Sequence, residues 1–198
     1  RAKAPPKSDL ISMLAHSDVA DMDPQTFLST LMLLIVGGND TTRNSISGGL
    51  LALLDNPLEM NKLKEDPSLV SSLVPEIIRW QTPLTSMRRT STRPVVLNGQ
   101  EIPEGAKIIM WYLSGNRDET VIPNAASFII DRASPRHHLS FGFGIHRCMG
   151  NRLAEMQLQV LWEEILSRSM NIELQGEPQR TYSNAVRGFT QLPVRIVA

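Results

Sequence analysis

The sequence has 198 residues, enough for one domain with a sizeable core, and its 20 Lys and Arg balance its 20 Asp and Glu. Because the charges balance, the protein has no net charge that would attract nucleic acid. Its single cysteine excludes an internal disulfide, as is typical of proteins in a reducing compartment. The most apolar stretch, residues 27–36, is far shorter than the ~20 residues that cross a bilayer, so we expect a cytoplasmic protein without a membrane span.

The first half of the sequence predicts helices. Asp23 is a good N-cap, and Pro24 fits the first position of a long helix. Asn56-Pro57 should end this helix and begin the next one. Ser8 should cap a shorter helix near the start of the sequence. Helices are therefore expected over residues 8–15, 24–55, 58–64 and 68–81.

The second half predicts short strands before a last long helix. Asn98-Gly99 is a turn dipeptide between two short runs, which indicates a hairpin. Strands are expected at 95–97, 100–102 and 107–113, an irregular stretch at 114–140, a helix at 149–168, and short strands and turns from 171 to 198. The fold class is therefore mainly α with a small β component.

The only cysteine, Cys148, lies in a glycine-rich loop, Phe141 to Gly150, just before the last helix. Glycines allow a flat partner to approach closely, and a thiolate near a helix start gains from the helix dipole. A structural zinc needs four well-spaced ligands, for which His137, His138 and His146 are poorly spaced, whereas haem needs one protein ligand. The loop favours haem coordination, with a buried thiol as the alternative.

A second motif, Gly37-Gly38-Asn39-Asp40-Thr41-Thr42, lies within the long helix. Each glycine costs a helix about 1 kcal/mol relative to alanine, and threonine hydroxyls can bond backbone carbonyls and open the helix. One interpretation is a notch where another helix packs closely. The other is a widened turn beside a flat cofactor, where Asp40 and Thr41 supply a carboxylate and a hydroxyl for proton delivery. The motif alone leaves both open.

Charged residues form the third and fourth motifs. Glu76 and Arg79 are spaced i, i+3 and so share a helix face. An exposed pair of this kind contributes little to stability. A buried pair needs further hydrogen-bonding partners for its charged groups. Arg132, at the end of the run Phe128 to Arg132, is the predicted partner, and another arginine would bind an anion such as a haem propionate. The alternative for these arginines is an ordinary solvated surface.

In order and spacing, the four motifs resemble those of the cytochromes P-450, the haem-thiolate monooxygenases. The shared patterns are Gly-Gly-x-Asp-Thr-Thr, Glu-x-x-Arg, Phe-x-x-x-Arg and Phe-x-x-Gly-x-His-x-Cys-x-Gly. The resemblance implies the cytochrome P-450 fold, haem b as cofactor and Cys148 as the axial ligand of the haem iron. It also implies that Asp40 and Thr41 are the acid–alcohol pair of oxygen activation. Glu76, Arg79 and Arg132 would form a structural triad.

The same resemblance assigns further residues around the haem and the substrate. His146 stands where family members hold a propionate, and Arg89 matches the second propionate arginine, with Arg88 as the alternative. Phe141 and Gly142 belong to the haem-binding loop. The residues implied to line an apolar substrate pocket are Leu33, Val36, Gly37, Leu84, Thr85, Met87 and Phe189.

Three segments resemble the soluble bacterial alkane and fatty-acid terminal hydroxylases: Met87–Thr90, Trp111–Asp118 and His137–His146. The likeness implies insertion of one atom of O2 into the terminal C–H bond of an apolar small molecule, a medium-chain alkane or fatty acid. Ferredoxin and ferredoxin reductase would supply the electrons. The alternative is a haem-binding sensor or carrier module without oxygenase turnover.

The resemblance covers the C-terminal half of a family-length protein, because the sequence begins just before the long helix. We therefore expect residues 1–198 to be one partial cytochrome P-450 domain whose N-terminal half is absent. A ferredoxin would dock on the Cys148 face, where Arg136, Arg147 and Arg152 are available to attract an acidic partner. The alternative is that these arginines are ordinary solvated charges.

Overall fold

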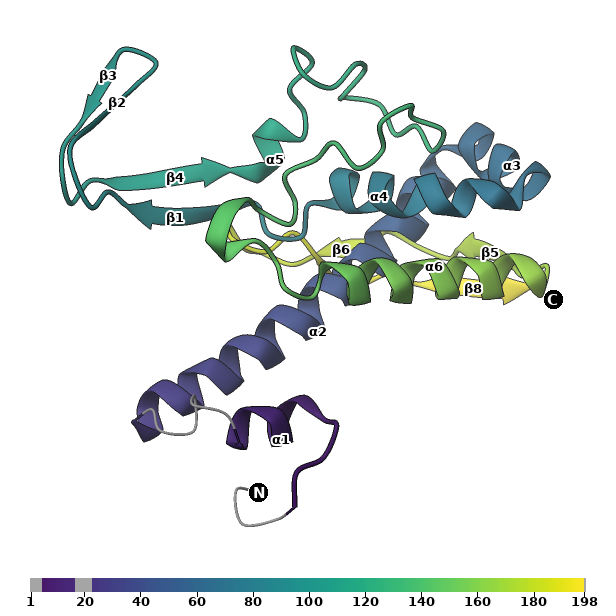
Figure 1. The fold of residues 1–198 in the computed structure, drawn as a ribbon. Coiled ribbons are helices and arrows are strands. Elements are labelled where there is room, and N and C mark those ends of the chain that lie inside the picture. Colours follow the sequence, from purple (N-terminus) through teal and green to yellow (C-terminus); the bar gives the residue numbers. More distant parts are fainter. Residues whose placement is uncertain (1–4, 17–22, 198) are drawn as a thin grey trace. The chain divides into compact units, whose positions relative to one another are not determined.

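The computed structural model describes residues 5–16 and 23–197. The chain forms two compact units, Arg1–Asp40 and Thr41–Ala198. Helix α1 (Leu10–Ala15) belongs to the first unit, and the long helix α2 (Pro24–Asp55) contributes residues to both (Figure 1). The predicted limits of α2 are confirmed.

Aspartates cap the helices of the first unit. The Asp23 carboxylate accepts the N–H groups of Gln25 and Thr26 at 3.0 Å, so the predicted cap of α2 is present. The expected cap of α1 is wrong by one residue: Asp9 rather than Ser8 accepts the N–H of Ser12, at 2.8 Å. A carboxylate is the stronger acceptor of the two side chains, and it stands at the position that reaches the third N–H of the helix.

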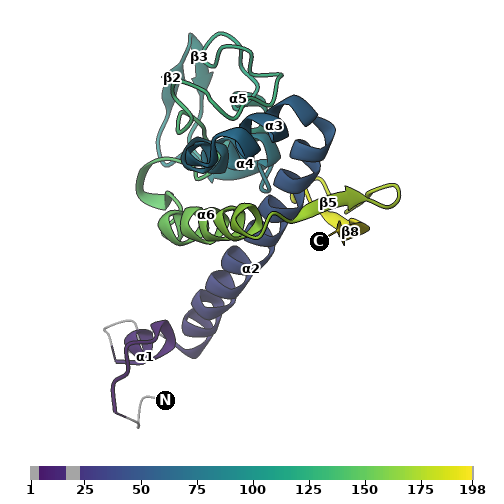
Figure 2. The same cartoon turned by 90° about the vertical axis from the view of Figure 1, so that its right-hand side faces the viewer.

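The second unit is built on four helices. These are the C-terminal part of α2, α3 (Pro57–Glu65), α4 (Val70–Gln81) and α6 (Asn151–Ser167), and α4 and α6 lie side by side (Figures 1 and 2). A short 3-10 turn, η2 (Pro67–Leu69), precedes α4 and moves its start later than expected. Their apolar faces meet in a core whose fully buried members include Leu53, Leu63, Leu73, Ile77, Ile130, Leu158 and Trp162.

A close approach between α2 and α4 occurs at Gly48-Gly49. A Cβ atom on Gly49 would lie 2.6–2.8 Å from three side-chain carbons of Ile77, and one on Gly48 would overlap the side chain of Gln81. Glycine is therefore required here by space. A close helix contact of the kind considered for Gly37-Gly38 is found at this second glycine pair, and α2 is helical through Gly37-Gly38.

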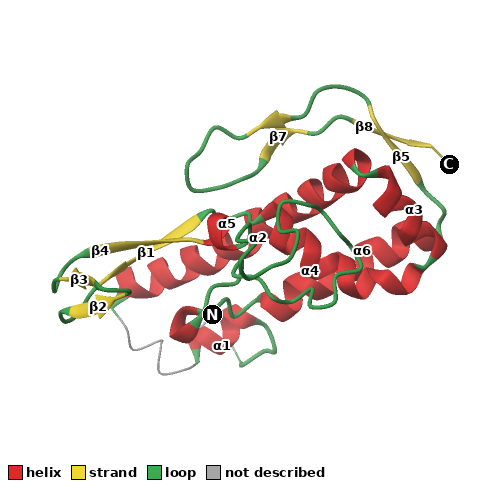
Figure 3. Cartoon of the chain, turned by 90° about the horizontal axis from the view of Figure 1, so that it is seen from above, coloured by secondary structure: helices red, strands yellow, loops and turns green. Residues whose placement is uncertain are grey.

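Among the residues that the structure describes, the strands form four antiparallel pairs rather than one sheet (Figure 3). The predicted hairpin at Asn98-Gly99 is confirmed, and both turn residues have positive φ angles, 48° and 77°. The pairs are β1 (Ser86–Thr90) with β4 (Lys107–Trp111), β2 (Val95–Leu97) with β3 (Gln100–Ile102), β5 (Asn171–Leu174) with β8 (Val194–Val197), and β6 (Gln179–Arg180) with β7 (Phe189–Gln191).

Two segments differ from the predicted elements. The strand expected over residues 107–113 stops at Trp111, because Tyr112–Gly115 turns into the short helix α5, closed by the bond from Asn116 N–H to Tyr112 O at 2.9 Å. Strand β1 was not expected, and its pairing with β4 across Ser86↔Trp111 fixes it. None of the helices in the described ranges is long and apolar enough to span a membrane.

Candidate functional site

The loop that carries Cys148 is closed by its own backbone. The N–H of Cys148 donates to Phe141 O at 2.8 Å, and the short 3-10 turn η3 (Gly144–His146) lies inside the loop. Gly142 and Gly144 have φ angles of +67° and +76°, which side chains rarely adopt. A Cβ atom on Gly142 would also lie 3.1 Å from the hydroxyl oxygen of Tyr112. Gly142 is therefore favoured by its positive φ angle, and a Cβ atom there would also crowd Tyr112.

Three apolar side chains of the cysteine loop and its flank are exposed, as is the cysteine. Cys148 is exposed, and Phe143, Ile145 and Met149 are exposed by 83%, 96% and 77%. Exposed apolar residues this close together in the sequence are compatible with a loop that binds an apolar group. The loop thus offers one exposed sulfur with exposed apolar residues nearby in the sequence.

This donor set fits haem better than zinc. Within the described ranges no group of three or more His, Cys, Asp and Glu residues is placed to hold a metal ion, so the ligand set of a structural zinc is missing. Haem requires one axial protein ligand, since the porphyrin supplies the other nitrogens. Cys148, with the apolar residues beside it, meets that requirement.

The structure brings Glu76, Arg79 and Arg132 into one buried cluster. The Glu76 carboxylate accepts four N–H groups: Arg79 Nε at 2.7 Å, Arg79 Nη2 at 2.7 Å, Arg132 Nε at 3.0 Å and the backbone of Ile129 at 2.8 Å. Glu76 and Arg79 are completely buried. A buried carboxylate of this kind is stable only because each oxygen is paired and hydrogen-bonded.

Arg79 uses all of its N–H groups within this cluster. Besides Glu76, its guanidinium donates to the carbonyls of Asn116 at 2.7 Å, Ala125 at 2.8 Å and Ser127 at 2.9 Å. A guanidinium carries five N–H donors, so none is left without an acceptor. Arg132 adds bonds to the carbonyls of Asn124 and Ser127, both at 2.7 Å. The cluster therefore ties helix α4 to the irregular stretch that leads to Cys148.

Arg89 and Met87 share one face of the β1–β4 pair. They alternate with Arg88 along β1, so Arg88 lies on the opposite face. Arg89 is half-buried, and its Nη1 donates to Arg88 O at 3.0 Å. It forms no ion pair with any residue that the structure describes. His146 is exposed at the end of η3.

Asp40 and Thr41 are consecutive residues of α2. Asp40 is the last residue of the first unit and Thr41 the first of the second. Thr41 is half-buried, and its carbonyl accepts the hydroxyl of Ser45 at 2.9 Å. Such bonds to the carbonyl four residues earlier are the ones that bend helices.

The predicted substrate-pocket residues lie in both units. In the first, Leu33 and Val36 are exposed on α2. In the second, Leu84 bridges to Val186, and Thr85 N–H donates to Ala185 O at 3.0 Å. This pairing brings Leu84 and Thr85 beside the segment that leads into β7. There the buried Phe189 packs its ring 4.6 Å from the guanidinium carbon of Arg180.

Two arginines that the sequence did not single out cap the C-terminal end of α4. Arg117 Nη2 and Arg187 Nη1 both donate to Trp80 O at 2.8 Å, and the Arg117 guanidinium lies 4.2 Å above the Trp80 ring. Cations are favoured at a helix C-terminus. Burial, with repulsion from Arg79, lowers the pKa of Arg117 to about 10, and burial lowers that of Arg187 as well.

His138 precedes the cysteine loop and is kept neutral. Burial lowers its pKa to about 4, and the positive charges of Arg147 and Arg79 add to the effect. Its Nδ1 accepts the N–H of Ser140 at 3.3 Å, and its ring lies 5.5 Å from that of Phe141. A neutral ring that accepts this bond supports the start of the loop.

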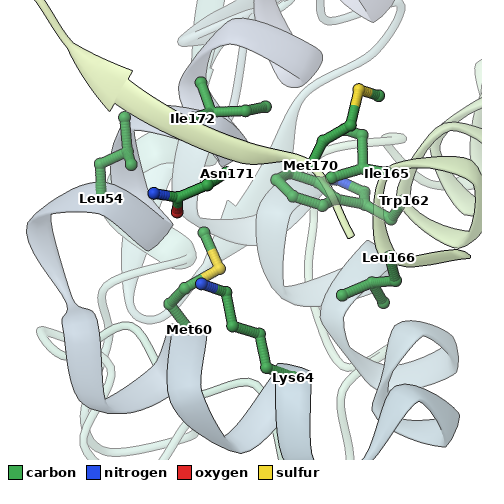
Figure 4. A pocket seen from close by; sticks show the side chains of 9 residues that line it. All are labelled: Leu54, Met60, Lys64, Trp162, Ile165, Leu166, Met170, Asn171 and Ile172. Carbon is green, nitrogen blue, oxygen red and sulfur yellow. The ribbon is translucent and has the colours of Figure 1, made fainter. Parts of the chain in front are cut away.

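A cavity of about 70 Å³ lies away from these residues, between α3, α6 and β5 (Figure 4). Its walls are mainly apolar, with Lys64 and Asn171 as polar members. The indole N–H of Trp162, one of the lining residues, has no hydrogen-bond partner among the described residues. The cavity contains none of the predicted site residues.

Comparison with known proteins gives a consistent result. The sequence profile described as Cytochrome P450 matches residues 4–197. The solved structure of CYP153D17 from Sphingomonas sp. PAMC 26605 is 52% identical, with a TM-score of 0.92 over 98% of this chain and 49% of that one.

Two curated relatives match over nearly the whole chain. Linalool 8-monooxygenase of Pseudomonas putida is 38% identical over 98% of this chain and 48% of its own length. Methyl-branched lipid omega-hydroxylase of Mycobacterium bovis is 36% identical over 94% of this chain and 44% of its own length. The chain thus spans about half the length of the curated relatives it matches.

Proposed function

Because the chain belongs to the cytochrome P450 family, whose cofactor is haem b, we propose that it forms the haem-binding part of a monooxygenase. The net reaction consumes O2, a substrate C–H bond, two electrons and two protons, and it yields an alcohol and water. The observation that carries the proposal is the exposed thiol of Cys148 in a glycine-rich loop flanked by exposed apolar side chains. Haem supplies the oxygen chemistry when bound, and a thiolate ligand favours O–O cleavage.

The residues of the loop and of β1 would hold the cofactor. Cys148, which would bind the haem iron, stands three residues before α6 begins at Asn151. His146 and Arg89 would bind the two propionates, and Arg89 is suited to this because it forms no ion pair with a described residue. Phe141 accepts the Cys148 N–H, and Gly142 allows the loop its positive φ angle.

Asp40 and Thr41 would deliver the protons that the reduction of O2 consumes. The hydroxyl of Thr41 would pass on its proton, and the Asp40 carboxyl group would replace it. A binding module without turnover has no need of such a relay. This pair therefore favours the monooxygenase over the alternative of a haem sensor or carrier.

The proposed substrate is a medium-chain alkane or fatty acid, hydroxylated at its end. Support comes from the apolar residues assigned to the pocket and from a relative named as a lipid omega-hydroxylase. The proposed electron donors are ferredoxin and its reductase, docking near the exposed Arg147 and Arg152. Arg136 is partly neutralised by Glu155, at 3.4 Å. We place the protein in the cytoplasm, consistent with its single cysteine.

The ligand assignment is tested by spectroscopy of the reduced protein with carbon monoxide. Thiolate ligation gives a Soret band shifted well to the red, and Cys148→Ser should abolish this shift. An unchanged band in Cys148→Ser would refute the assignment. The proton relay is tested by product formed per electron pair in Thr41→Ala, which should fall; equal coupling in variant and parent would favour the sensor or carrier alternative.

A further inference from the structure

Asn116 is a fully buried polar residue to which none of the sequence motifs assigns a role. It follows α5 directly and stands between helix α4 and the start of the cysteine loop. Its Nδ2 donates to Thr82 Oγ1 at 2.9 Å and to Ser140 Oγ at 2.8 Å, and its Oδ1 accepts the Leu139 N–H at 2.7 Å. Its carbonyl accepts Arg79 Nη1 at 2.7 Å. Every hydrogen-bonding atom of the side chain is therefore partnered.

The direction of each bond is fixed by the neighbouring hydroxyls. Ser140 Oγ donates to Ile78 O at 2.8 Å, and Thr82 Oγ1 donates to Arg79 O at 2.6 Å. Each hydroxyl has one proton, which it gives to a carbonyl of α4, so each can only accept from Asn116. An amide with two N–H groups on one side and an oxygen on the other satisfies all three partners. A carboxylate of the same shape does not.

These bonds lead directly to the cysteine loop. Leu139 and Ser140, which bond to Asn116, are followed by Phe141, whose carbonyl accepts the Cys148 N–H at 2.8 Å. Leu139 O also accepts the N–H of Gly142, at 2.8 Å. The two residues directly before the loop are therefore held by the Asn116 side chain.

The short helix α5 supports the same segment by close packing. A Cβ atom on Gly115 would lie 2.7 Å from Cδ1 of Leu139, and one on Gly142 would lie 3.1 Å from the Tyr112 hydroxyl oxygen. The backbone of Gly115 thus packs against the Leu139 side chain, and that of Gly142 packs against Tyr112.

We propose that Asn116 is a positioning residue for Cys148: by joining Leu139 and Ser140 to the end of α4, it holds the loop in the conformation from which the sulfur binds iron. This inference rests on the proposed ligation of haem by Cys148. The charged cluster of Glu76 bonds the irregular stretch at Ile129, whereas Asn116 bonds Leu139 and Ser140, the two residues that directly precede the loop.

The test compares Asn116→Asp with the parent in the intact protein. Aspartate keeps the size and the acceptor for Leu139 but removes both N–H donors. Two readouts follow the loop: amide hydrogen exchange of residues 139–148 with and without haem, and the rate at which the red-shifted Soret band of the reduced, CO-bound protein is lost. The exchange rate of these amides and the rate of band loss should each rise by about tenfold or more, because the buried hydroxyl of Thr82 and the half-buried hydroxyl of Ser140 lose their donors.

A core variant separates positioning from general destabilisation. Leu63→Ala removes a completely buried side chain of α3 and should lower the urea midpoint without loosening the loop. The two variants are compared at urea concentrations equally far below their own midpoints. If Asn116→Asp and Leu63→Ala then change both readouts equally, the positioning role is overturned.

A second variant keeps the test decisive if Asn116→Asp does not fold. Ser140→Ala removes one partner of Asn116 but leaves the Leu139 bond, so its effect should have the same direction and be smaller. An unchanged loop in Ser140→Ala would overturn the inference. A parent without any red-shifted band would instead refute ligation by Cys148, and with it the proposed function.

Discussion

Replacing Glu76 with glutamine should destabilise the protein strongly, because the carboxylate lies in a buried cluster of two guanidinium groups. One of its oxygens accepts Arg79 Nη2 and Ile129 N–H, and the other accepts Arg79 Nε and Arg132 Nε. An amide NH2 placed at either oxygen would face two donors, so two of the four bonds are lost in any orientation. The two arginines would also lose their only carboxylate in the cluster.

The expected loss in the free energy of unfolding is about 3–5 kcal/mol, the usual cost of removing one partner from a buried ion pair. The chain offers a matched control in Glu173→Gln. Glu173 accepts Arg195 Nη2 at 2.7 Å, the same distance as the Glu76–Arg79 contact, but its side chain is 42% exposed. An exposed pair of this kind contributes about 0–1 kcal/mol.

Urea unfolding followed by far-ultraviolet circular dichroism measures both variants against the parent, with equal haem loading. Glu76→Gln should move the midpoint strongly toward low urea, and Glu173→Gln should barely move it. Similar shifts for the two variants would refute the argument that burial, rather than distance, sets the strength of these contacts.

Two further predictions concern packing and pH. Gly49→Ala should lower the free energy of unfolding by about 1–3 kcal/mol, because its Cβ atom would overlap Ile77. The higher helix propensity of alanine should offset this loss by about 1 kcal/mol. Adding Ile77→Val, which removes Cδ1, should relieve part of the overlap. Strictly additive urea midpoints in the double variant would contradict this packing argument. Folding lowers the pKa of His138 from 6.5 to about 4, so as the pH falls the unfolded chain binds a proton before the folded one does. The contribution of His138 to the free energy of unfolding is therefore fully present above pH ~6.5 and falls by up to roughly 3 kcal/mol as the pH drops toward 4. His138→Gln should flatten this part of the urea-midpoint profile, and an unchanged slope would show that other groups cause it.

Local features of the fold were predictable because neighbouring residues determine them. Asp23 and Pro24 start α2 through bonds within a single turn, and Asn98-Gly99 forms its hairpin because both residues tolerate positive φ angles. Strand β1 has no such signal. Its sequence, Ser-Met-Arg-Arg-Thr, becomes a strand only by pairing with β4.

Local sequence patterns did not show where distant segments pack too closely for a side chain, or which distant residues form hydrogen bonds. Gly37-Gly38 and Gly48-Gly49 look alike as sequence, yet it is at the second pair that the side chains of α4 approach too closely for a Cβ atom. Asn116 likewise stands in a stretch of turn-forming residues. Its importance is evident only from the buried partners on α4 and on the loop.

The sequence by itself determined which reactive groups the candidate site contains: one thiol in a glycine-rich loop, an Asp-Thr pair in a long helix, and a Glu-x-x-Arg pair with a later arginine. These are properties of residue type and short spacing. The tertiary structure alone decided how the charges are satisfied, since Arg79 bonds to carbonyls 37 to 48 residues away. A buried guanidinium needs an acceptor for each N–H group, and only the folded backbone brings those acceptors to it.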